Sequence, residues 1–427
     1  MKIGVGFLGA GTVGGSLLRR LVDHHDAIAA KSGIELEVRR VAVRDMAKPR
    51  VLDLPADVLT ENPADVVADD RVDLVVEVMG GLEPAGDLVL EALQSGKPVV
   101  TANKALVAAR GKELISAADE AGVSLLFEAA VGGGIPIIRP LSESLAGERI
   151  TRVLGIVNGT TNFILTKMIE DGQSYEAVLN EAQALGYAEA DPTADVSGAD
   201  AAAKAAILAS LAFGIWVSSD RVYHEGIDRL QQIDFEFAAD LGYRPKLLAI
   251  AEQSAQGIAV RVHPALVPED HPLASVRGAT NAVFVEGPAI GELLFTGPGA
   301  GGDATATAVL GDVIDAAREL LAKTPVKAPI RFAPGTLRDF EDVNTKWYLR
   351  LEVADQPGVL AQIAATFGDH NVSIKSVWQE GRSDAATLLL VTHDALERDL
   401  RAARSALDGL DVVRQVAAVV RVQSDEP

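Results

Sequence analysis

One short stretch of the chain combines the residue types that acid–base chemistry requires. Asp200 and Lys204 lie in a predicted helix, Ala199–Phe213, and their i, i+4 spacing puts both side chains on one face. A lysine can donate or accept a proton at a substrate oxygen when its surroundings lower its pKa from the free value of about 10.4. An ordinary surface ion pair has the same spacing, so the pattern alone leaves both interpretations open.

Other charged residues lie before this helix or at the end of a predicted strand. Glu189, Asp191 and Asp195 precede the helix. Such acids can bind the ammonium group of a substrate, but Asp191 and Asp195 could equally cap a helix. Lys104 follows a short strand, at the edge of a parallel sheet where ligands bind, and could equally be a surface lysine.

The N-terminal segment contains a glycine-rich loop of the kind that binds a dinucleotide. Gly9, Gly11 and Gly14 form a G-x-G-x-x-G pattern between a predicted strand and a predicted helix. The first glycine permits a tight turn, the second lets the backbone approach a pyrophosphate, and the third allows close packing of helix on strand. The helix N-terminus supplies N–H groups and a positive dipole end to the anion. A plain structural turn is the alternative.

The second predicted strand ends in Arg44 and Asp45. An acid at this position favours the ribose 2′-hydroxyl of NAD, whereas an arginine can accept the 2′-phosphate of NADP. Because both residues are present, we expect NADP or NAD and leave the preference open. A solvated strand end is the alternative.

The elements that position these residues form a mainly parallel sheet over residues 1–135. Apolar strands alternate there with amphipathic stretches, which implies an α/β sheet covered by helices on both faces. The predicted strands are Ile3–Leu8, Leu36–Val43, Val72–Met79, Val99–Val100 and Val123–Phe127, and the predicted helices are Val13–Ala30, Ala85–Ser95 and Gly111–Ala121.

The pattern changes after this Rossmann-type domain. Residues 136–302 mix strands such as Val153–Val157 with Ala-rich helices, and we expect an α+β catalytic and dimerisation domain there. A helix at about residues 303–322 is expected to return and complete the first domain. The proline-containing residues 323–346 are expected to be a linker. Residues 347–427 follow the order strand–helix–strand–strand–helix–strand of a ferredoxin-like fold.

The composition limits the classes of function. Lys plus Arg is 39 and Asp plus Glu is 60 in 427 residues, and the resulting net charge of −21 argues against a general nucleic-acid binder. Cysteine is absent, which excludes disulfides, thiolate metal sites and a cysteine nucleophile. The apolar run Ala205–Val217 is shorter than the roughly 20 residues of a membrane span. No secretory signal is visible at the N-terminus, and we expect a cytoplasmic protein.

Several separate motifs occur in a fixed order over residues 1 to about 320. They are the glycine loop, Lys104, Glu128–Pro136, Asn158–Phe163, Gly186–Pro192 and Asp195–Lys204. With them the chain resembles the homoserine dehydrogenase family. The resemblance implies an oxidoreductase that interconverts L-homoserine and L-aspartate 4-semialdehyde by hydride transfer with NAD(P), in threonine, methionine and isoleucine biosynthesis.

The resemblance also implies roles for individual residues. Lys204 would be the general acid/base at the reacting oxygen, and Lys104 a second catalytic residue near substrate and nicotinamide. Glu189 would hold the substrate's α-ammonium group, with help from Asp195. Asp200 would orient the lysine ammonium or hold substrate. The expected cofactor contacts are Gly9, Gly11, Thr12, Val13, Gly14, Arg44 and Lys104.

Two further segments match family motifs. Glu128 with the carbonyls of Val131, Gly133 and Ile135 resembles the family's monovalent-cation site, which would hold a structural Na⁺ or K⁺. From the sequence alone these glycines indicate only a turn. The segment Gly297–Asp303 precedes the helix that is expected to return to the nucleotide domain.

The C-terminal module resembles the ACT domain, a small ligand-sensing unit that usually pairs with a second copy. The resemblance rests on Asp355–Leu360 and Asn371–Ile374. It implies an amino-acid effector, expected to be L-threonine, with Gly358 and Asn371 as candidate contacts. Deleting residues 347–427 should then abolish inhibition by threonine. A dimerisation module without a ligand is the alternative.

Other dehydrogenases and a non-enzymatic regulator are the competing interpretations. Aspartate-semialdehyde dehydrogenase needs a cysteine nucleophile, which this chain lacks. The segment Asp200–Lys204 does not suit dihydrodipicolinate reductase-like enzymes. A regulator with a decayed site would have lost catalytic positions such as Lys104 and Glu189, and these are intact. We expect a homo-oligomer, dimer or tetramer, with no nucleic-acid or membrane partner.

Overall fold

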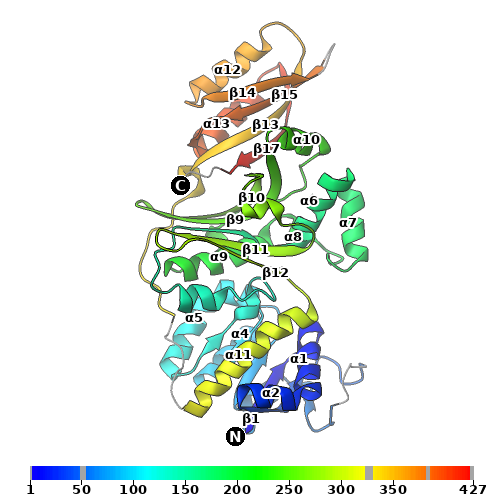
Figure 1. Cartoon of the computed structure of the whole chain (residues 1–427), viewed down its shortest axis with the longest axis vertical. Helices are drawn as coiled ribbons and strands as arrows, with labels where there is room; N and C mark the ends of the chain where they lie inside the picture. Colours follow the sequence, from blue (N-terminus) through cyan, green and yellow to red (C-terminus); the bar gives the residue numbers. More distant parts are fainter. Residues whose placement is uncertain (1, 49–53, 323–329, 381–384, 424–427) are drawn as a thin grey trace. The chain divides into compact units, whose positions relative to one another are not determined.

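The chain divides into two compact units in the computed structural model, which describes residues 2–48, 54–322, 330–380 and 385–423 (Figure 1). The first unit consists of Met1–Ile150, Ala206–Arg221 and Asn281–Pro334, and the second of Thr151–Ala205, Val222–Thr280 and Gly335–Pro427. Residues 323–329 of the expected linker, with Pro325 and Pro329, lie outside the described residues.

The first unit is built on a six-stranded parallel sheet in the order β3-β2-β1-β4-β5-β6. This is the strand order of a dinucleotide-binding Rossmann fold, and it confirms the predicted α/β class. The strands are β1 (Lys2–Leu8), β2 (Glu35–Ala42), β3 (Leu59–Thr60), β4 (Leu74–Glu77), β5 (Val99–Thr101) and β6 (Leu125–Leu126). The helices between them are α1 (Thr12–Asp23), α2 (His25–Ser32), α3 (Ala64–Ala68), α4 (Ala85–Gln94) and α5 (Lys104–Ala121).

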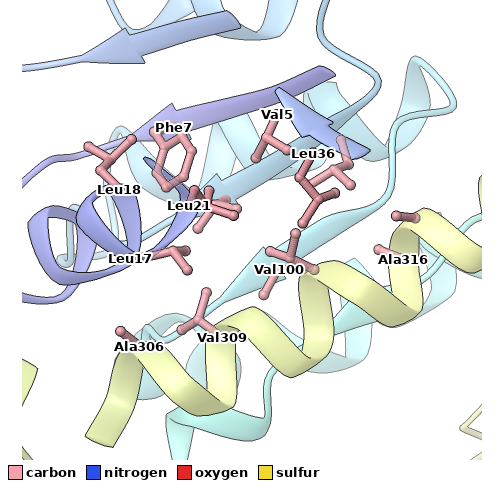
Figure 2. Close-up of a cluster of buried hydrophobic side chains, with 14 of the residues drawn as sticks. Val5, Phe7, Leu17, Leu18, Leu21, Leu36, Val100, Ala306, Val309 and Ala316 are labelled. Carbon is pink, nitrogen blue, oxygen red and sulfur yellow. The ribbon is translucent and has the colours of Figure 1, made fainter. Parts of the chain in front are cut away.

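A late segment of the chain completes the core of this sheet. Strand β1 is buried from its second residue onward, as expected for a parallel strand that is covered on both faces. Helix α11 (Gly302–Ala322) lies against α1, and its Ala306, Val309 and Ala316 join the same buried cluster as Leu17 and Leu21 (Figure 2). Residues about 300 positions apart in the sequence therefore share one hydrophobic core.

Local signals explain where these elements differ from the predicted ones. The predicted helix Val13–Ala30 is two helices, because the polar run around His24 ends α1 and starts α2. Helix α5 starts seven residues before its predicted start, at Lys104, because the side chain of Asn103 accepts a hydrogen bond from the N–H of Leu106 at 3.1 Å and caps the helix. The short β3 and α3 were not predicted.

The remainder of the first unit consists of shorter elements. A 3₁₀ turn at Glu128–Ala130 and a π-helical turn at Pro140–Ser144 follow β6. Strands β11 (Thr280–Gly287) and β12 (Gly291–Pro298) are neighbours and lead into α11.

The second unit is built on a mixed sheet in which β7, β9, β10, β17, β13, β15 and β14 follow one another. The strands before the C-terminal module are β7 (Arg152–Ile156), β8 (Tyr223–His224), β9 (Tyr243–Ser254) and β10 (Gly257–Pro268). The helices are α6 (Gly159–Asp171), α7 (Tyr175–Ala184), α8 (Thr193–Val196), α10 (Gln232–Asp240) and the first part of α9 (Ala199–Phe213). Short 3₁₀ turns lie at Ser219–Arg221, Pro272–Ser275 and Phe340–Asp342.

The C-terminal module has the predicted ferredoxin-like order. Its elements are β13 (Asn344–Ala354), α12 (Val359–Asp369), β14 (Ile374–Glu380), β15 (Ala385–Thr392), the short β16 (Ala395–Leu396), α13 (Glu397–Asp408) and β17 (Val413–Val422). The four long strands are antiparallel in the order β17-β13-β15-β14. Both helices contribute to one buried cluster with the strands, through residues such as Ile363, Phe367 and Leu400.

The sheet of this module continues into the segment before it. Strand β17 pairs in parallel with β10, at Ala265 with Arg421 and at Leu266 with Val422. Beside this pairing, Asp234 of α10 is 1% exposed and accepts hydrogen bonds from the Tyr348 hydroxyl at 2.8 Å and the Arg350 Nε at 2.9 Å. The sequence had indicated a separate module, whereas these contacts join the module to the middle of the chain.

Candidate functional site

The glycine loop of the first unit has the geometry that a dinucleotide site requires. Gly9 follows β1 with φ +109°, a conformation that side chains rarely adopt, and its N–H donates to the carbonyl of Ala42 at 3.1 Å. A Cβ on Gly14 would lie 2.5 Å from the carbonyl oxygen of Gly9, so this glycine is needed for packing. Helix α1 starts at Thr12, directly after the loop, and its first N–H groups have no partner within the helix.

Gly11 differs from its two companions. A Cβ at this position would have no protein atom within 4 Å, and its φ of −75° lies outside the left-handed region. Packing within the described residues therefore does not require a glycine here. A ligand that approaches the backbone closely does require one, and the pyrophosphate of a dinucleotide at a helix N-terminus is such a ligand.

A buried carboxylate that the sequence reading missed lies at the ligand-binding edge of the sheet. Glu77 ends β4 and is fully buried. It accepts hydrogen bonds from the N–H groups of Met79 at 2.9 Å and Gly80 at 3.0 Å and from the Thr101 hydroxyl at 2.6 Å. Burial raises the pKa of Glu77, and these hydrogen bonds oppose the shift. The one sequence signal for this site was a single acidic residue at the end of an otherwise apolar strand.

The Glu77 network also fixes the position of Lys104. The Thr101 hydroxyl accepts from the N–H of Asn103 at 3.0 Å, and Asn103 caps α5, which makes Lys104 the first residue of the helix. A cation at a helix N-terminus is electrostatically unfavourable by about 0.3–1 kcal/mol. Lys104 is exposed at this helix N-terminus, at the edge of the sheet where the ligand contact is predicted.

Arg44 lies just beyond β2, where the ribose of the adenosine binds in such folds. It is exposed and forms no hydrogen bond or ion pair with another described residue. The neighbouring Asp45 differs, because its carboxylate accepts a hydrogen bond from the N–H of Ala47 at 2.8 Å. The arginine is therefore available to a ligand, while the acid is engaged in a turn.

In the second unit, one asparagine brings three of the predicted site residues together. The Asn158 amide donates to Asp195 Oδ1 at 2.7 Å and to Asp200 Oδ2 at 2.9 Å. The Lys204 ammonium donates to Asp200 Oδ2 at 2.7 Å and to the Val157 carbonyl at 2.8 Å. The predicted i, i+4 pair is therefore part of a buried network, since Lys204 is only 9% exposed and Asp200 6%.

The network leaves specific capacity for a substrate. The Lys204 ammonium has three donors, and two of them are used by described residues, so one N–H remains for an incoming oxygen. Asp195 and Asp200 place carboxylate oxygens next to this free N–H. Such oxygens can accept hydrogen bonds from a cationic group, such as the α-ammonium of an amino acid.

Asn158 belongs to one of the family motifs, but its role does not follow from the sequence. Its side-chain oxygen accepts the N–H of Thr161 at 2.9 Å and caps α6, while its amide group reaches the two aspartates. An asparagine directly before a predicted helix indicates a cap. The contacts to residues 37 and 42 positions away depend on tertiary structure.

The other acids before α9 lie outside this network. The Asp191 carboxylate accepts from the N–H and the hydroxyl of Thr193, at 3.1 and 2.6 Å, and these hydrogen bonds lower its pKa. Asp191 therefore closes a turn directly before α8, whose N-cap residue is Pro192. Glu189 is exposed on the segment between α7 and α8, and the backbone carbonyl of Glu189 accepts from the Gln183 amide at 3.0 Å.

The loop of the predicted cation site is organised around Glu128. The Glu128 carboxylate is buried and accepts hydrogen bonds from the N–H groups of Ile137, Ile138 and Arg139 at 2.6–3.0 Å. It therefore uses three of its roughly four acceptor positions. Asp312 of α11 accepts the Glu128 N–H at 2.8 Å, and burial raises the Asp312 pKa to about 6 against the opposing effect of Arg139.

The oxygen ligands that this loop could offer to a hard cation come mainly from its backbone carbonyl groups. Among the described residues, no group of three or more His, Cys, Asp or Glu side chains could hold a metal ion. The carbonyl oxygens of Val131, Gly133 and Ile135 are neutral hard donors, and Gly132 and Gly133 adopt positive φ, which lets the loop turn tightly. Glu128 would add its negative charge and at most one further oxygen.

The two predicted effector contacts in the C-terminal module occupy special backbone positions. Gly358 precedes α12 with φ +92°, and a Cβ there would meet nothing within 4 Å, so backbone conformation is the local reason for glycine. Asn371 follows α12 with φ +59°, and its N–H donates to the Gly368 carbonyl at 3.0 Å. Asparagine is a common left-handed residue at helix ends, so Asn371 also has a local structural explanation.

Among the helices of the described residues, none combines the length and the apolar character that crossing a bilayer would require.

Three segments of the chain match models of known protein families. Residues 136–314 match the family model "Homoserine dehydrogenase", residues 9–128 match "Homoserine dehydrogenase, NAD binding domain", and residues 347–412 match "ACT domain". The homoserine dehydrogenase of Corynebacterium glutamicum is 48% identical over 99% of this chain and 96% of its own length.

Solved structures give the same result. The crystal structure of a homoserine dehydrogenase from Thiobacillus denitrificans is 45% identical, covers 99% of both chains and has a TM-score of 0.93. A hyperthermophilic archaeal homoserine dehydrogenase in complex with NADPH is 30% identical over 75% of this chain and 98% of its own, with a TM-score of 0.61.

The fold and these matches define a nicotinamide-dependent dehydrogenase with a Rossmann domain, a mixed-sheet catalytic region and a C-terminal ACT domain. The chain belongs to the homoserine dehydrogenase family. The resemblance predicted from the sequence motifs is confirmed, and so is the assignment as an enzyme of amino-acid biosynthesis.

Proposed function

We propose that the protein interconverts L-homoserine and L-aspartate 4-semialdehyde, in the biosynthesis of threonine, methionine and isoleucine. The observation that carries this proposal is the buried network of Asp195, Asn158, Asp200 and Lys204 in a chain of this family. It offers one N–H donor to a substrate oxygen and carboxylate oxygens to a substrate ammonium group. Both features match a substrate that contains an alcohol or aldehyde oxygen and an α-ammonium group.

In this proposal Lys204 moves the proton at the reacting oxygen. The nicotinamide, when bound, supplies or accepts the hydride. In the reductive direction the Lys204 ammonium donates its free proton to the aldehyde oxygen, and in the oxidative direction the neutral amine takes the proton from the alcohol. Asp200 and the Val157 carbonyl orient the ammonium through its other two N–H groups.

The remaining proposed roles concern binding. We assign the substrate's α-ammonium group to Glu189 and Asp195, and a contact near substrate and nicotinamide to Lys104. The cofactor's pyrophosphate is assigned to the loop of Gly9, Gly11 and Gly14 with the N–H groups of Thr12 and Val13. The open N-terminus of α1 and the absence of a packing reason for Gly11 support this assignment.

Replacing Lys204 tests the proposed chemistry. Lys204→Ala should lower kcat for homoserine oxidation by about 10²–10⁴-fold, because general acid–base catalysis contributes that much, and leave cofactor affinity unchanged. Lys167→Ala is the matched control, since Lys167 also pairs at i, i+4 with an aspartate, Asp171, but at a more exposed position. A kcat for Lys204→Ala within a few-fold of that of the unmodified enzyme would remove Lys204 from this role.

We propose NADP as the preferred cofactor. Arg44 is exposed and unpaired among the described residues, and the archaeal relative was solved in complex with NADPH. Losing a charged hydrogen bond costs about 1.5–3 kcal/mol, so Arg44→Ala should raise the KM for NADP about tenfold or more and leave the KM for NAD unchanged. Equal effects on both cofactors would contradict a contact with the 2′-phosphate.

We also propose a structural Na⁺ or K⁺ in the loop formed by Glu128 and the carbonyls of Val131, Gly133 and Ile135. The hard oxygen donors and the buried negative charge support it. The melting temperature should then rise when choline chloride is replaced by NaCl or KCl at equal ionic strength. A melting temperature that depends on ionic strength alone would exclude the site.

Regulation by L-threonine through the ACT domain is the last part of the proposal, with Gly358 and Asn371 as candidate contacts. The ACT match and the left-handed loop at Gly358 support it. The truncation suggested by the sequence is a poor test, because it would remove β17 from β10 and leave Asp234 without Arg350. Gly358→Val and Asn371→Ala in the full chain are better. A homo-oligomer and a cytoplasmic location stay predictions.

A further inference from the structure

An arginine beside the proposed cation site is bound by two aspartates from a distant segment of the chain. Arg139 Nη2 donates to Asp312 Oδ1 at 2.6 Å, and Arg139 Nη1 lies 3.0 Å from Asp315 Oδ2. Both aspartates belong to α11 and, three residues apart, lie on one face of that helix. The two terminal nitrogens of the guanidinium are therefore engaged by α11, within the first unit.

The third nitrogen of this guanidinium lies near Glu128 but does not form a hydrogen bond with it. Arg139 Nε is 3.6 Å from Glu128 Oε2, which is too far for a hydrogen bond, and it is buried without an acceptor among the described residues. A shortening of about 0.7 Å would give the usual N–H···O distance. Because a buried N–H without an acceptor is costly, Arg139 would gain free energy by binding Glu128.

Glu128 has one acceptor position left for such a partner. Its Oε1 accepts the N–H groups of Ile137 and Ile138, whereas its Oε2 accepts the backbone N–H of Arg139 at 3.0 Å. Since a carboxylate has roughly four acceptor positions, the remaining one is on Oε2. A cation bound by Glu128 would take this position, and so would Arg139 Nε. The two positive groups also repel each other, so they exclude one another at this oxygen.

The aspartates hold Arg139 firmly because α11 is fixed in the hydrophobic core. Val309 and Ala316 of this helix belong to the buried cluster of the first unit (Figure 2). Asp312 is 1% exposed, and its Oδ2 accepts the Glu128 N–H at 2.8 Å, so its carboxylate is held on two sides. Helix α11 therefore cannot follow the guanidinium, and Arg139 reaches Glu128 only by giving up its aspartate partners.

We infer that Arg139 competes with a monovalent cation for Glu128 Oε2, and that Asp312 and Asp315 keep the site open to the ion by holding the guanidinium on α11. This role deepens the proposed Na⁺ or K⁺ site and rests on it. The three residues act through Glu128 and are positioning residues. Because a guanidinium repels a divalent ion twice as strongly as a monovalent one at the same distance, Arg139 also makes the loop prefer monovalent ions.

The melting temperature of the full chain measures the competition. It is titrated with NaCl, KCl or CaCl₂ while choline chloride keeps the ionic strength constant, and each titration gives a half-saturating ion concentration. Arg139→Gln should lower this concentration about tenfold or more for Na⁺ or K⁺, because it removes the competing charge, and by a larger factor for Ca²⁺. Arg110→Gln is the matched control, since Arg110 pairs with Glu83 and Asp87 instead, and it should change the concentration less than about twofold.

Asp312→Asn should have the opposite effect. The amide keeps an acceptor for the Glu128 N–H but binds the guanidinium more weakly than a carboxylate does, so the half-saturating concentration should rise about tenfold or more. Once Arg139 is replaced, there is no guanidinium to hold. The double variant Asp312→Asn/Arg139→Gln should therefore bind the ion as tightly as Arg139→Gln alone. Asp315→Asn, at a less buried position, takes the place of Asp312→Asn if that variant does not fold.

The double variant separates competition from a merely structural role. If Asp312 only supported the loop, its replacement would weaken ion binding with or without Arg139. The competition is refuted if the double variant binds as weakly as Asp312→Asn, or if Arg139→Gln leaves ion binding unchanged or weakens it. In those cases Na⁺ or K⁺ still stabilises the unmodified enzyme, and the proposed ion site remains. An unmodified enzyme without ion-specific stabilisation would refute the site and the competition together.

Discussion

Asn158 offers the sharpest test of how the catalytic network is held together. Its amide donates to Asp195 at 2.7 Å and to Asp200 at 2.9 Å, and its oxygen accepts the N–H of Thr161 at 2.9 Å. The residue is only 4% exposed. Asn158→Ala removes these three hydrogen bonds at once and leaves two carboxylates close together without their shared donor. The Thr161 hydroxyl, which also donates to the Asn158 side-chain oxygen at 3.0 Å, keeps the backbone carbonyl of residue 158 as an acceptor.

The magnitude follows from the contacts that are lost. A helix cap contributes about 1 kcal/mol, and each hydrogen bond to a charged group about 1.5–3 kcal/mol, for a sum of about 4–7 kcal/mol. Water that enters the vacated space restores part of this. We therefore expect the free energy of unfolding to fall by about 3–5 kcal/mol. With Asp200 less constrained, Lys204 loses its orientation, and kcat should fall about 10–100-fold.

The assays are urea unfolding followed by circular dichroism and initial rates of homoserine oxidation. Ser174→Ala is the control for the cap alone, because Ser174 caps α7 from an exposed position. It should cost about 1 kcal/mol and leave kcat within about twofold. A value of kcat/KM for Asn158→Ala within threefold of the unmodified enzyme would refute the reasoning, because the network would then not position Lys204.

Asn158→Asp adds a diagnostic pH dependence. The aspartate keeps the acceptor for the Thr161 N–H but replaces the donor with a third carboxylate beside Asp195 and Asp200. Mutual repulsion raises the pKa of the group, and protonation at lower pH restores an O–H donor. Activity relative to the unmodified enzyme should therefore rise as the pH falls. A ratio that is constant with pH would contradict the proposed electrostatics.

Three further predictions concern other parts of the molecule. Gly11→Ala should leave the melting temperature unchanged but weaken cofactor binding, measured by fluorescence titration. Gly14→Ala should destabilise the fold by about 1–3 kcal/mol, because its Cβ meets the loop backbone. An equal loss of stability in both variants would contradict the different roles given to the two glycines. Asp234→Ala should cost up to about 3–5 kcal/mol in urea unfolding, since it leaves the buried Arg350 with only the more distant Glu352 at 3.4 Å. A loss below about 1 kcal/mol would show that the pair does not hold the ACT domain in place. Burial raises the pKa of Glu397, but the charge of Arg421 and nearby hydrogen bonds outweigh it and lower this pKa from 4.5 to about 2. The ionised Glu397 therefore contributes up to about 3 kcal/mol to stability, fully above pH 4.5 and progressively less as the pH falls toward 2. Acid unfolding of Glu397→Gln should lack this pH-dependent loss.

The sequence was most informative where a function depends on neighbouring residues. The glycine loop, the alternation of strands and helices and the i, i+4 pair of Asp200 and Lys204 are local patterns, and the Rossmann order and the ion pair are both present in the structure. Boundaries were less accurate where a cap decided them. Helix α5 starts at Lys104 because of one side-chain hydrogen bond from Asn103, which the apolar periodicity does not reveal.

Contacts between residues far apart in the sequence could not be predicted, because local patterns carry no information about them. Hydrogen bonds such as those of Asn158 to Asp195 and Asp200, or of Asp234 to Arg350, form because the fold brings separate segments together. No spacing rule encodes them. Burial is also a tertiary property. In the sequence Glu77 is only one acid in an apolar strand, whereas in the structure it is fully buried and accepts hydrogen bonds from Met79 and Thr101 at the ligand-binding edge of the sheet.

The residue types and their order by themselves determined the family, the nicotinamide chemistry and the presence of an ACT domain. These depend on short motifs of neighbouring residues, which can be identified without knowing the path of the chain. Tertiary structure alone decided that the ACT sheet continues through β10 and that Asn158 joins the proposed catalytic residues. It also decided that Arg139 lies beside Glu128 and binds two aspartates of α11. These features depend on the distances between segments, and only the folded chain sets those distances.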